Sequence, residues 1–281
     1  MKKSIILVLA LLLLAAPALA SAAEITVISR EDGSGTRGAF IELFGVEVRT
    51  ADGQRIDMTT MEAIITNSTS VMLSGVANDP NAIGYVSLGA LNDNVKALAV
   101  DGAPATTEAI KAGEYKISRP FMIAVRDDVS EAAQDFIAFI LSAEGQAVIE
   151  ARGYIAVADD APAYTVSGVS GKVVVAGSSS VTPVMESLKE AYAALNPGVD
   201  VEVQQSDSSI GMQATIDGIC DIGMASREVR ESEIEKGLSA TVIAIDGIAV
   251  IVNLRNERDH IAKDNVTAIF TGEVTDWSEV E

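Results

Sequence analysis

Short apolar runs alternate with segments of helical periodicity along most of the chain. The runs Ile25–Ile28 and Lys172–Ala176 are rich in β-branched residues, as strands are. Thr36–Phe44 follows the first run and repeats apolar residues at helical spacing. Valines alternate with polar residues over 199–203, and Asp246–Val252 is almost entirely apolar, as in a buried central strand. This succession of strand and helix predicts an α/β fold.

Capping residues mark where several helices begin and end. Ser130 and Ser142 stand as N-caps before apolar-periodic segments, and the second of these helices is expected to end near Gly153. Thr182 is predicted to cap another helix, with proline in its first turn. Residues 159–171 hold Asp, Pro, Ser and Gly in quick succession, which predicts a connection between two halves of the chain.

The first residues have the pattern of a secretory signal peptide. Lys2 and Lys3 precede an apolar run over 5–16, which is too short to span a membrane, and small residues follow Pro17. We therefore assign residues 1–22 to a signal peptide and expect an exported protein. No cysteine lies near the cleavage region, so a lipid anchor on cysteine is not expected.

The composition excludes several classes of function. The 281 residues include 20 Lys plus Arg and 40 Asp plus Glu, a net charge of −20 that disfavours binding to nucleic acid. A single cysteine, Cys220, excludes an internal disulfide and a thiolate zinc site. A single histidine, His260, excludes a multi-histidine metal site, and the sequence implies no cofactor.

Three turns share one design, in which a strand ends, a turn rich in hydroxyl groups follows and a helix begins. These turns are residues 29–37, 177–183 and 204–211. The first N–H groups of a helix have no intrahelical partner, and the helix dipole places positive charge there. One such turn is commonly a plain helix cap. Three of them, with Arg30 beside the first, predict an anion site.

The first turn also matches a dinucleotide-binding pattern. Residues 33–38 read G-x-G-x-x-G after a strand, and Asp52 or Asp57 could supply the acidic residue that the pattern expects. We disfavour this interpretation, because an exported protein rarely meets a nicotinamide cofactor. The charged residues 30–32 also stand where a compact turn is expected.

The first turn, Arg30-Glu31-Asp32-Gly33-Ser34-Gly35-Thr36-Arg37, resembles the phosphate-binding loop of the phosphate-binding proteins of ABC importers. Four further segments resemble the same family, namely residues 177–183, 207–211, 221–227 and 246–253. The resemblance implies a two-lobed periplasmic-binding-protein-like fold of type II, with the ligand in the cleft between two α/β lobes that close over it.

The order of these segments differs from that of the family. There the Gly-Ser-Ser-type loop lies near the N-terminus and the Arg30-type loop comes later, whereas here the later half comes first. The C-terminal segment Phe270–Val280 would run almost directly into Ile25–Arg30 in the family's order. We therefore interpret the chain as a circular permutant with neighbouring natural termini. A gene-model artefact is the alternative.

The resemblance also implies lobe boundaries. One lobe comprises residues 24–99 plus 248–281 and carries the Arg30–Thr36 loop. The other comprises residues 100–247 and carries the Ser178–Thr182 and Ser208–Ser209 loops. Hinge crossings are then expected near Val95 to Gly102 and near Asp246 to Ile248.

By the same resemblance, Arg30 gives paired donors to two phosphate oxygens. Asp32 and Ser209 are supporting residues, Asp32 by pairing with Arg30; a plain helix cap is the alternative for Asp32. The other predicted ligand-binding residues offer backbone N–H groups or hydroxyls: Ser34, Gly35, Thr36, Ser179, Ser180, Val181, Ser208 and Ser226.

Many family members carry Asp where this chain has Ser226. A carboxylate there accepts the proton of phosphate and repels sulfate, so Ser226 leaves the choice between phosphate and sulfate open. The resemblance implies a monomeric, non-enzymatic binding protein that captures inorganic phosphate and delivers it to the membrane permease of an ABC importer. We expect it to be soluble and periplasmic or extracellular.

Two alternatives remain at this point. One is a secreted binder or sensor of another tetrahedral oxyanion, such as sulfate or molybdate. The other, of a different class, is an exported Ser hydrolase that would need His260 beside a serine-rich turn. The glycosylation pattern Asn67-Ser68-Thr69 is attributed to chance.

Overall fold

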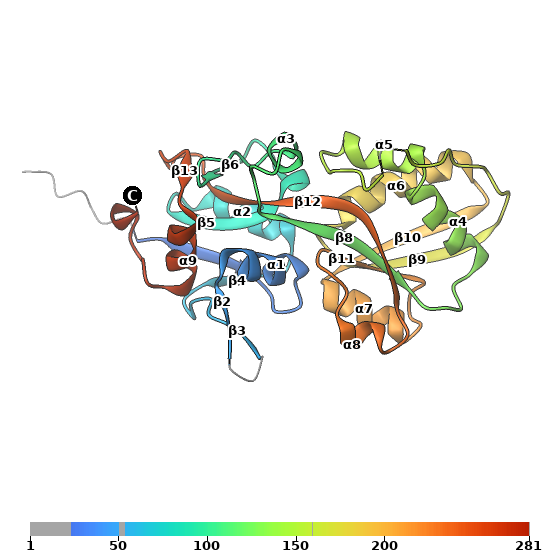
Figure 1. Ribbon diagram of the computed structural model, residues 1–281, viewed down its shortest axis with the longest axis horizontal. Helices are drawn as coiled ribbons and strands as arrows, with labels where there is room; N and C mark the ends of the chain where they lie inside the picture. Colours follow the sequence, from blue (N-terminus) through green and yellow to red (C-terminus); the bar gives the residue numbers. More distant parts are fainter. Residues whose placement is uncertain (1–23, 51–53, 159, 281) are drawn as a thin grey trace, which may run out of the picture.

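The computed structural model describes residues 24–50, 54–158 and 160–280, so the expected signal peptide lies outside the described residues. The chain forms two α/β lobes that lie side by side along the long axis of the molecule (Figure 1). The described part of the chain contains no helix that is both long and apolar enough to cross a membrane.

The first lobe is built from the two ends of the described chain. Its N-terminal part contains β1 (Thr26–Arg30), α1 (Gly35–Phe44), β2 (Glu47–Arg49), β3 (Arg55–Asp57), β4 (Ile64–Thr66), α2 (Thr69–Asn78), β5 (Ala82–Ser87), the 3₁₀ helix η1 (Leu88–Ala90), β6 (Val95–Ala97), β7 (Ala99–Val100) and α3 (Thr107–Lys111). Its C-terminal part contains the end of β12 (Ser239–Asn253), β13 (His260–Ile261), α9 (Lys263–Thr271) and η2 (Trp277–Glu279).

The second lobe is formed by the middle of the chain. It contains β8 (Ser118–Val125), α4 (Glu131–Ile140), α5 (Ala143–Ala151), β9 (Gly171–Ser178), α6 (Thr182–Leu195), β10 (Val199–Ser206), α7 (Ser208–Ile216), β11 (Ile222–Ala225), α8 (Glu231–Ile234) and the start of β12. Helices α4, α5 and α6 lie on one side of its sheet, and α7 and α8 lie on the other (Figure 1).

The long strand β12 belongs to both lobes. The strand order β10-β9-β11-β8-β12-β5-β1-β4 places it between β8 of the second lobe and β5 of the first. It pairs antiparallel with β8 over Ser239–Gly247 and with β5 over Ile248–Val252. Every residue from Asp246 to Asn253 is buried. The central strand that the apolar run predicts is therefore confirmed, because this run has no solvent-facing side.

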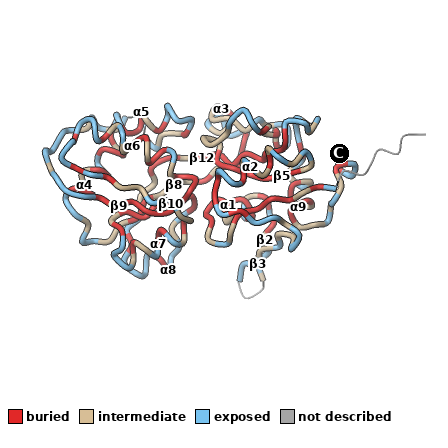
Figure 2. The backbone as a smooth tube through the Cα atoms, turned by 180° about the vertical axis from the view of Figure 1, so that it is seen from behind, coloured by how far each residue is buried: buried red, intermediate tan, exposed pale blue. Residues whose placement is uncertain are grey.

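Two large apolar cores lie on either side of the crossing strands (Figure 2), and a third, smaller cluster surrounds Met212 in the second lobe. In the first, the rings of Phe40 and Tyr85 stack with centroids 3.9 Å apart, and Phe44 and Phe270 pack beside Phe40. The second is centred on aromatic residues of α4 and α6 and on the valines of β9. Each lobe therefore has a core of its own, and only strands connect the two.

The first hinge crossing differs from the expected position near Val95 to Gly102. Strands β6 and β7 remain in the first lobe, and Val100, Ala109 and Ile117 pack in its core. The chain passes into the second lobe only between Ile117 and Ser118, where β8 begins. The apolar side chains of α3 and its flanks explain the shift, because they complete the first core. We propose lobes of residues 24–117 plus 248–280 and of residues 118–247.

Most predicted helix caps are present. The hydroxyls of Ser130 and Ser142 accept bonds from the N–H groups of Ala133 and Gly145, as predicted. Thr182 differs, because Val181 is the N-cap of α6 and Thr182 is the first helical residue. The Thr182 hydroxyl donates to the carbonyl of Ser178 instead, at 3.1 Å.

Candidate functional site

Four strand-to-helix turns meet where the lobes face each other. Strands β1 and β4 are parallel in the first lobe and lead into α1 and α2, and β9 and β10 are parallel in the second and lead into α6 and α7. Ligands of α/β sheets bind outside the carboxyl ends of the strands, where helix N-termini gather. The cleft between the lobes therefore carries the positive ends of helices from both sides.

The turns bring a cluster of buried hydroxyl groups into this cleft. Thr36 of the first lobe bonds to Ser180 of the second, with 2.7 Å between the hydroxyl oxygens. The Ser226 hydroxyl accepts from Ser178 at 2.9 Å and lies 3.5 Å from the hydroxyls of Thr36 and Ser208. All of these hydroxyl residues are buried. The groups that hydroxyl-rich turns offer to a ligand are therefore concentrated in one place.

Close approach of the lobes requires the glycine at position 35. A Cβ on Gly35 would lie 2.5 Å from the Ser208 hydroxyl oxygen and 2.8 Å from that of Ser226, both across the cleft. Ser34, just before it, caps α1 by accepting from the N–H of Arg37 at 3.3 Å. The backbone of the loop at Gly35 thus lies directly against the other lobe.

Arg30 is the buried cation of this site, with 2% of its surface exposed. Its Nη2 donates to the Ser179 hydroxyl at 3.0 Å across the cleft, and Nη1 donates to Thr69 at 3.5 Å. Nε and Nη2 also donate to the two carboxylate oxygens of Glu31, at 2.8 and 2.7 Å. A guanidinium held in this way keeps its remaining donors aimed in a fixed direction.

The expected pairing of Asp32 with Arg30 is wrong. Asp32 pairs instead with Arg37 at 3.0 Å, and its side chain is 97% exposed. Asp32 points outward from the turn, whereas Arg30 points into the cleft and forms its ion pair with Glu31. Two adjacent acids in a turn face different directions, so the sequence pattern alone could not choose between them.

Thr69 is a site residue that the sequence analysis missed. Its hydroxyl lies 3.3 Å from that of Ser179 and 3.2 Å from that of Ser180, so it joins the cluster from α2. The signal was present, because the strand 64–66 is followed by Asn-Ser-Thr-Ser and then by a helix, the same design as the three turns identified. The overlap with a glycosylation pattern concealed it.

The other predicted residues have distinct positions. Val181 is fully buried as the N-cap of α6. Ser208 begins α7, and its hydroxyl accepts from the backbone N–H of Ser226 at 3.2 Å. Ser209 lies at the same helix end but contacts the backbone of the first lobe at Gly33 rather than the hydroxyl cluster. The structure thus brings Arg30, Thr36 and the serines together and sets Asp32 and Ser209 apart from them.

Tyr85 forms hydrogen bonds with the start of the Arg30–Thr36 loop. The phenol oxygen lies 2.8 Å from the Ser29 hydroxyl and accepts from the Arg30 N–H at 3.1 Å. Burial raises the pKa of Tyr85 to about 12, so the phenol is neutral at physiological pH. This neutral group satisfies the backbone at Arg30 without competing for its positive charge.

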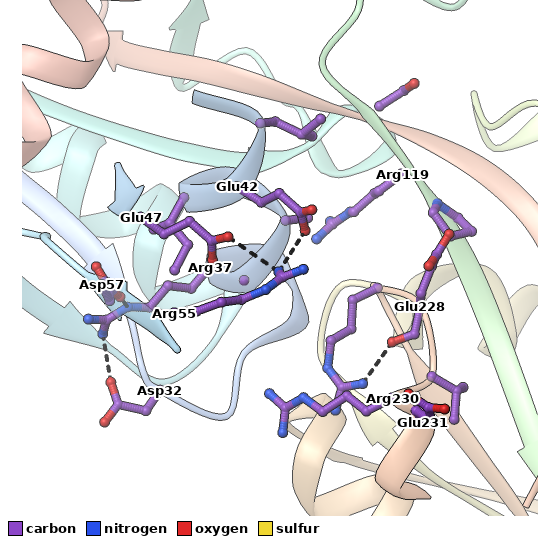
Figure 3. A pocket seen from close by; sticks show the side chains of 18 residues that line it. Asp32, Arg37, Glu42, Glu47, Arg55, Asp57, Arg119, Glu228, Arg230 and Glu231 are labelled. Atoms are coloured by element: carbon purple, nitrogen blue, oxygen red, sulfur yellow. Dashed lines mark hydrogen bonds and ion pairs between the residues drawn. The ribbon is translucent and has the colours of Figure 1, made fainter. Parts of the chain in front are cut away.

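A cavity of about 880 Å³ lies beside the cluster, between the lobes (Figure 3). Arg37 and Arg55 line it from the first lobe, and Arg119 and Arg230 line it from the second. Its carboxylates are largely paired: Asp32 and Asp57 with Arg37, and Glu42 and Glu47 with Arg55. The hydroxyl residues do not line this cavity, because they contact one another directly across the closed cleft.

Comparison with known proteins shows which family this chain resembles. A family model described as PBP superfamily domain matches residues 15–144 and 162–281. A protein of Streptococcus agalactiae named phosphate-binding protein PstS 2 is 57% identical over 261 residues, covering 92% of this chain and 89% of its own. A crystal structure of a phosphate ABC transporter phosphate-binding protein from Streptococcus pneumoniae has 43% identity and a TM-score of 0.72, covering 92% of this chain and all of its own.

A more distant relative matches only part of the chain. The phosphate-binding protein PstS of Bacillus subtilis is 31% identical over 113 residues, which is 40% of this chain and 38% of its own. The streptococcal match, in contrast, runs through in one stretch, so that relative carries its segments in the same order as this chain.

Proposed function

This chain belongs to the PBP superfamily and is a phosphate-binding protein of the PstS type, and on that premise we propose that it captures inorganic phosphate outside the cytoplasm. Its fold is the two-lobed fold of periplasmic binding proteins. The residues around the anion are Arg30, Thr36, Ser179, Ser180, Ser208 and Ser226, with Thr69 added to them and with the backbone N–H of Gly35. The predicted N–H groups of Ser34 and Val181 donate instead to the carbonyls of Glu31 and Ser178, at 3.0 Å each.

One observation carries the assignment of the site. The buried guanidinium of Arg30, the hydroxyls of both lobes and the N-termini of four helices converge on one point. Each of these groups stabilises negative charge, and a tetrahedral oxyanion can accept bonds from all of them at once. Entry of the anion would replace the hydroxyl contacts across the cleft by bonds to its oxygens.

The acidic surface does not prevent such binding. At physiological ionic strength, salt screens charges that lie farther from the site than about 8 Å, so the remote part of the net charge of −20 has little effect there. Hydrogen bonds to a charged group contribute about 1.5–3 kcal/mol each. The contact terms therefore exceed the remote repulsion, and we expect a Kd of about 1 μM or lower.

Ser226 bears on the choice of oxyanion. Its hydroxyl is fully buried and lies near three other hydroxyls. It can either donate a hydrogen bond to the anion or accept one from a protonated oxygen of the anion. A hydroxyl does not repel sulfate as a carboxylate does. We propose phosphate as the ligand because relatives are named for it; the alternative is sulfate or molybdate.

The protein is a binding protein and not an enzyme, as its relatives are. His260, which a hydrolase would need beside a serine-rich turn, is exposed on β13. That strand lies at the outer part of the first lobe, away from the cleft (Figure 1). We further propose that the protein acts as a monomer and delivers phosphate to the permease of an ABC importer.

Isothermal titration of residues 24–281 with phosphate tests the proposal, after bound ligand has been removed by partial unfolding and dialysis. Sulfate and molybdate are titrated in parallel. Arg30→Ala is expected to weaken phosphate binding by at least about 2 kcal/mol, because it leaves the buried anion without its counter-charge. Arg255→Ala, at an exposed arginine, is the matched control and should bind as the wild type does.

The outcomes separate the alternatives. Tight binding of sulfate and weak binding of phosphate would mean that the protein is a sulfate-binding protein. Binding to none of the three anions by a folded protein would overturn it. Phosphate affinity of Arg30→Ala within twofold of the wild type would reject the site while leaving the function in place.

A further inference from the structure

One contact across the cleft involves none of the hydroxyls assigned to the anion. Ser209, the second residue of α7, donates twice to the carbonyl oxygen of Gly33 in the first lobe. Its backbone N–H and its hydroxyl both lie 3.3 Å from that oxygen. This N–H is one of those that a helix start leaves without an intrahelical partner. The carbonyl of Gly33 therefore sits at the positive end of α7.

The loop is pressed closely against this helix end. A Cβ on Gly33 would overlap the carboxylate of Asp207, the N-cap of α7, so any other residue would have to displace that side chain. Asp207 is fixed in place because its Oδ1 accepts from the N–H of Ile210 at 2.8 Å. The glycine is needed here for closeness and not for an unusual backbone angle.

A buried ion pair holds Ser209 in position. Arg227 Nη2 donates to the Ser209 hydroxyl at 3.3 Å, so that hydroxyl accepts from Arg227 and donates to Gly33. Arg227 is fixed by Glu233, whose two carboxylate oxygens accept from Nη1 and Nη2 at 3.0 and 2.8 Å. Burial opposes ionisation of Glu233, but the bonds from Arg227 hold its pKa below the ordinary value. Both side chains are only 10% exposed.

We propose that Gly33, Ser209 and the Arg227–Glu233 pair form a closing latch, which holds the lobes together without touching the anion. The inference rests on the proposed function, in which closure traps phosphate. A contact present only in the closed state adds to apparent affinity by raising the closed population, and it slows opening. Ser209 and Arg227 are thus positioning residues: they set how long the anion stays bound, and the hydroxyl cluster sets which anion binds.

The latch is tested by stopped-flow measurement of phosphate release and association in Ser209→Ala, Gly33→Ala and the wild type. Ser209→Ala removes one of the two bonds, and we expect release to accelerate roughly 3- to 10-fold with association changed less than twofold. Gly33→Ala displaces the Asp207 side chain that caps α7 and disturbs the approach itself, so it should accelerate release further. Ser232→Ala, at an exposed serine of the same lobe, is the matched control and should leave both rates unchanged.

A second readout reports closure directly. Dyes at Asn94→Cys and Lys236→Cys, which are exposed residues on opposite lobes, give the closed fraction by energy transfer. The latch predicts a smaller closed fraction in both variants at equal phosphate occupancy. Release at the wild-type rate in both Ser209→Ala and Gly33→Ala would overturn the latch, whereas failure of the wild type to bind phosphate would overturn the proposed function instead.

Discussion

The contacts of Thr69 connect the two lobes through a single hydroxyl. It lies near Ser179 and Ser180 of the second lobe and accepts from Arg30 of the first. Thr69→Val keeps the shape of the side chain and removes only these bonds. We expect it to weaken phosphate binding by about 1 kcal/mol, roughly fivefold, because buried partners lose a hydrogen bond. Isothermal titration measures the change.

Thr69→Ser provides the control for this prediction, since it retains the hydroxyl and loses only a methyl group. It should bind within about twofold of the wild type if the hydrogen bonds matter. Weaker binding in Thr69→Ser together with wild-type binding in Thr69→Val would mean that the methyl group, through packing, is what the site needs from Thr69.

Residues of the site were predictable where a local pattern carried them. Arg30, Thr36 and Ser180 stand in turns whose strand, hydroxyl and helix signals all lie within a few positions. Glu31 was not identified as the partner of Arg30, because Glu31 and Asp32 are adjacent acids whose side chains pair with different arginines. Thr69 was missed for a different reason, because it also belongs to the glycosylation pattern Asn67-Ser68-Thr69, which was attributed to chance.

The paired strands β8 and β12 carry the connection between the lobes. At the crossing, Asp246 accepts from Arg119 Nε and Nη2 at 3.2 and 3.0 Å and from the Ser87 hydroxyl at 2.8 Å. Arg119 and Asp246 are both buried. This pair joins β8 to β12 at the crossing between the lobes.

Asp246→Asn is expected to lower the free energy of unfolding by about 3 kcal/mol, because it leaves a buried guanidinium without its counter-ion. Urea denaturation monitored by circular dichroism measures the change. Asp93→Asn, at an exposed aspartate, should remain close to the wild type. A loss below about 1 kcal/mol in Asp246→Asn would show that the neutral amide satisfies Arg119 equally well.

Elements were predictable when their apolar pattern had a single interpretation. The run that forms the end of β12 is buried on both faces, and helices α4 and α5 begin directly after the serines that cap them. The hairpin β2–β3 was not identified, because its strands are short and largely exposed. The first hinge was misplaced because α3 joins the first core through contacts far along the chain.

The ends of the described chain meet at one pole of the first lobe. Glu24 forms a bridge with Asp276, and the N–H of Ile25 donates to the carbonyl of Thr275 at 2.8 Å. The start of β1 and the C-terminus lie together in Figure 1. The strand pairing would therefore tolerate a peptide connection at this point, which is the geometry that circular permutation requires.

Segment order in relatives bears on the same question. The alignment with the streptococcal relative covers 92% of this chain and 89% of that relative in the same order, which argues against an assembly error peculiar to one gene. The relative from Bacillus subtilis aligns over 113 residues only. A linear alignment of permuted chains can cover only one part at a time, so a match of this extent is what permutation predicts. The permutation itself stays a prediction.

A protein whose segments are joined in the other order tests the circular permutation. Residues 171–280 are followed by a short Gly-Ser linker and then by residues 24–158, so that the ends now lie in the connection between α5 and β9. We expect it to fold and to bind phosphate with a Kd within about threefold of the original, because the cores and the four helix starts remain intact. The rearrangement leaves out Tyr164, whose hydroxyl bonds to Asp135, and a modest loss of stability should follow.

A second rearrangement shows whether the position of the ends matters. Opening the same circular chain between Ala249 and Val250 would cut β12 where it is fully buried, and this protein should not fold. Thermal unfolding and isothermal titration of the two rearranged proteins give the answer. If the chain beginning at residue 171 failed to fold while the original bound phosphate, the pole at Glu24 and Asp276 could not be a former chain connection, and the segment order would need another explanation.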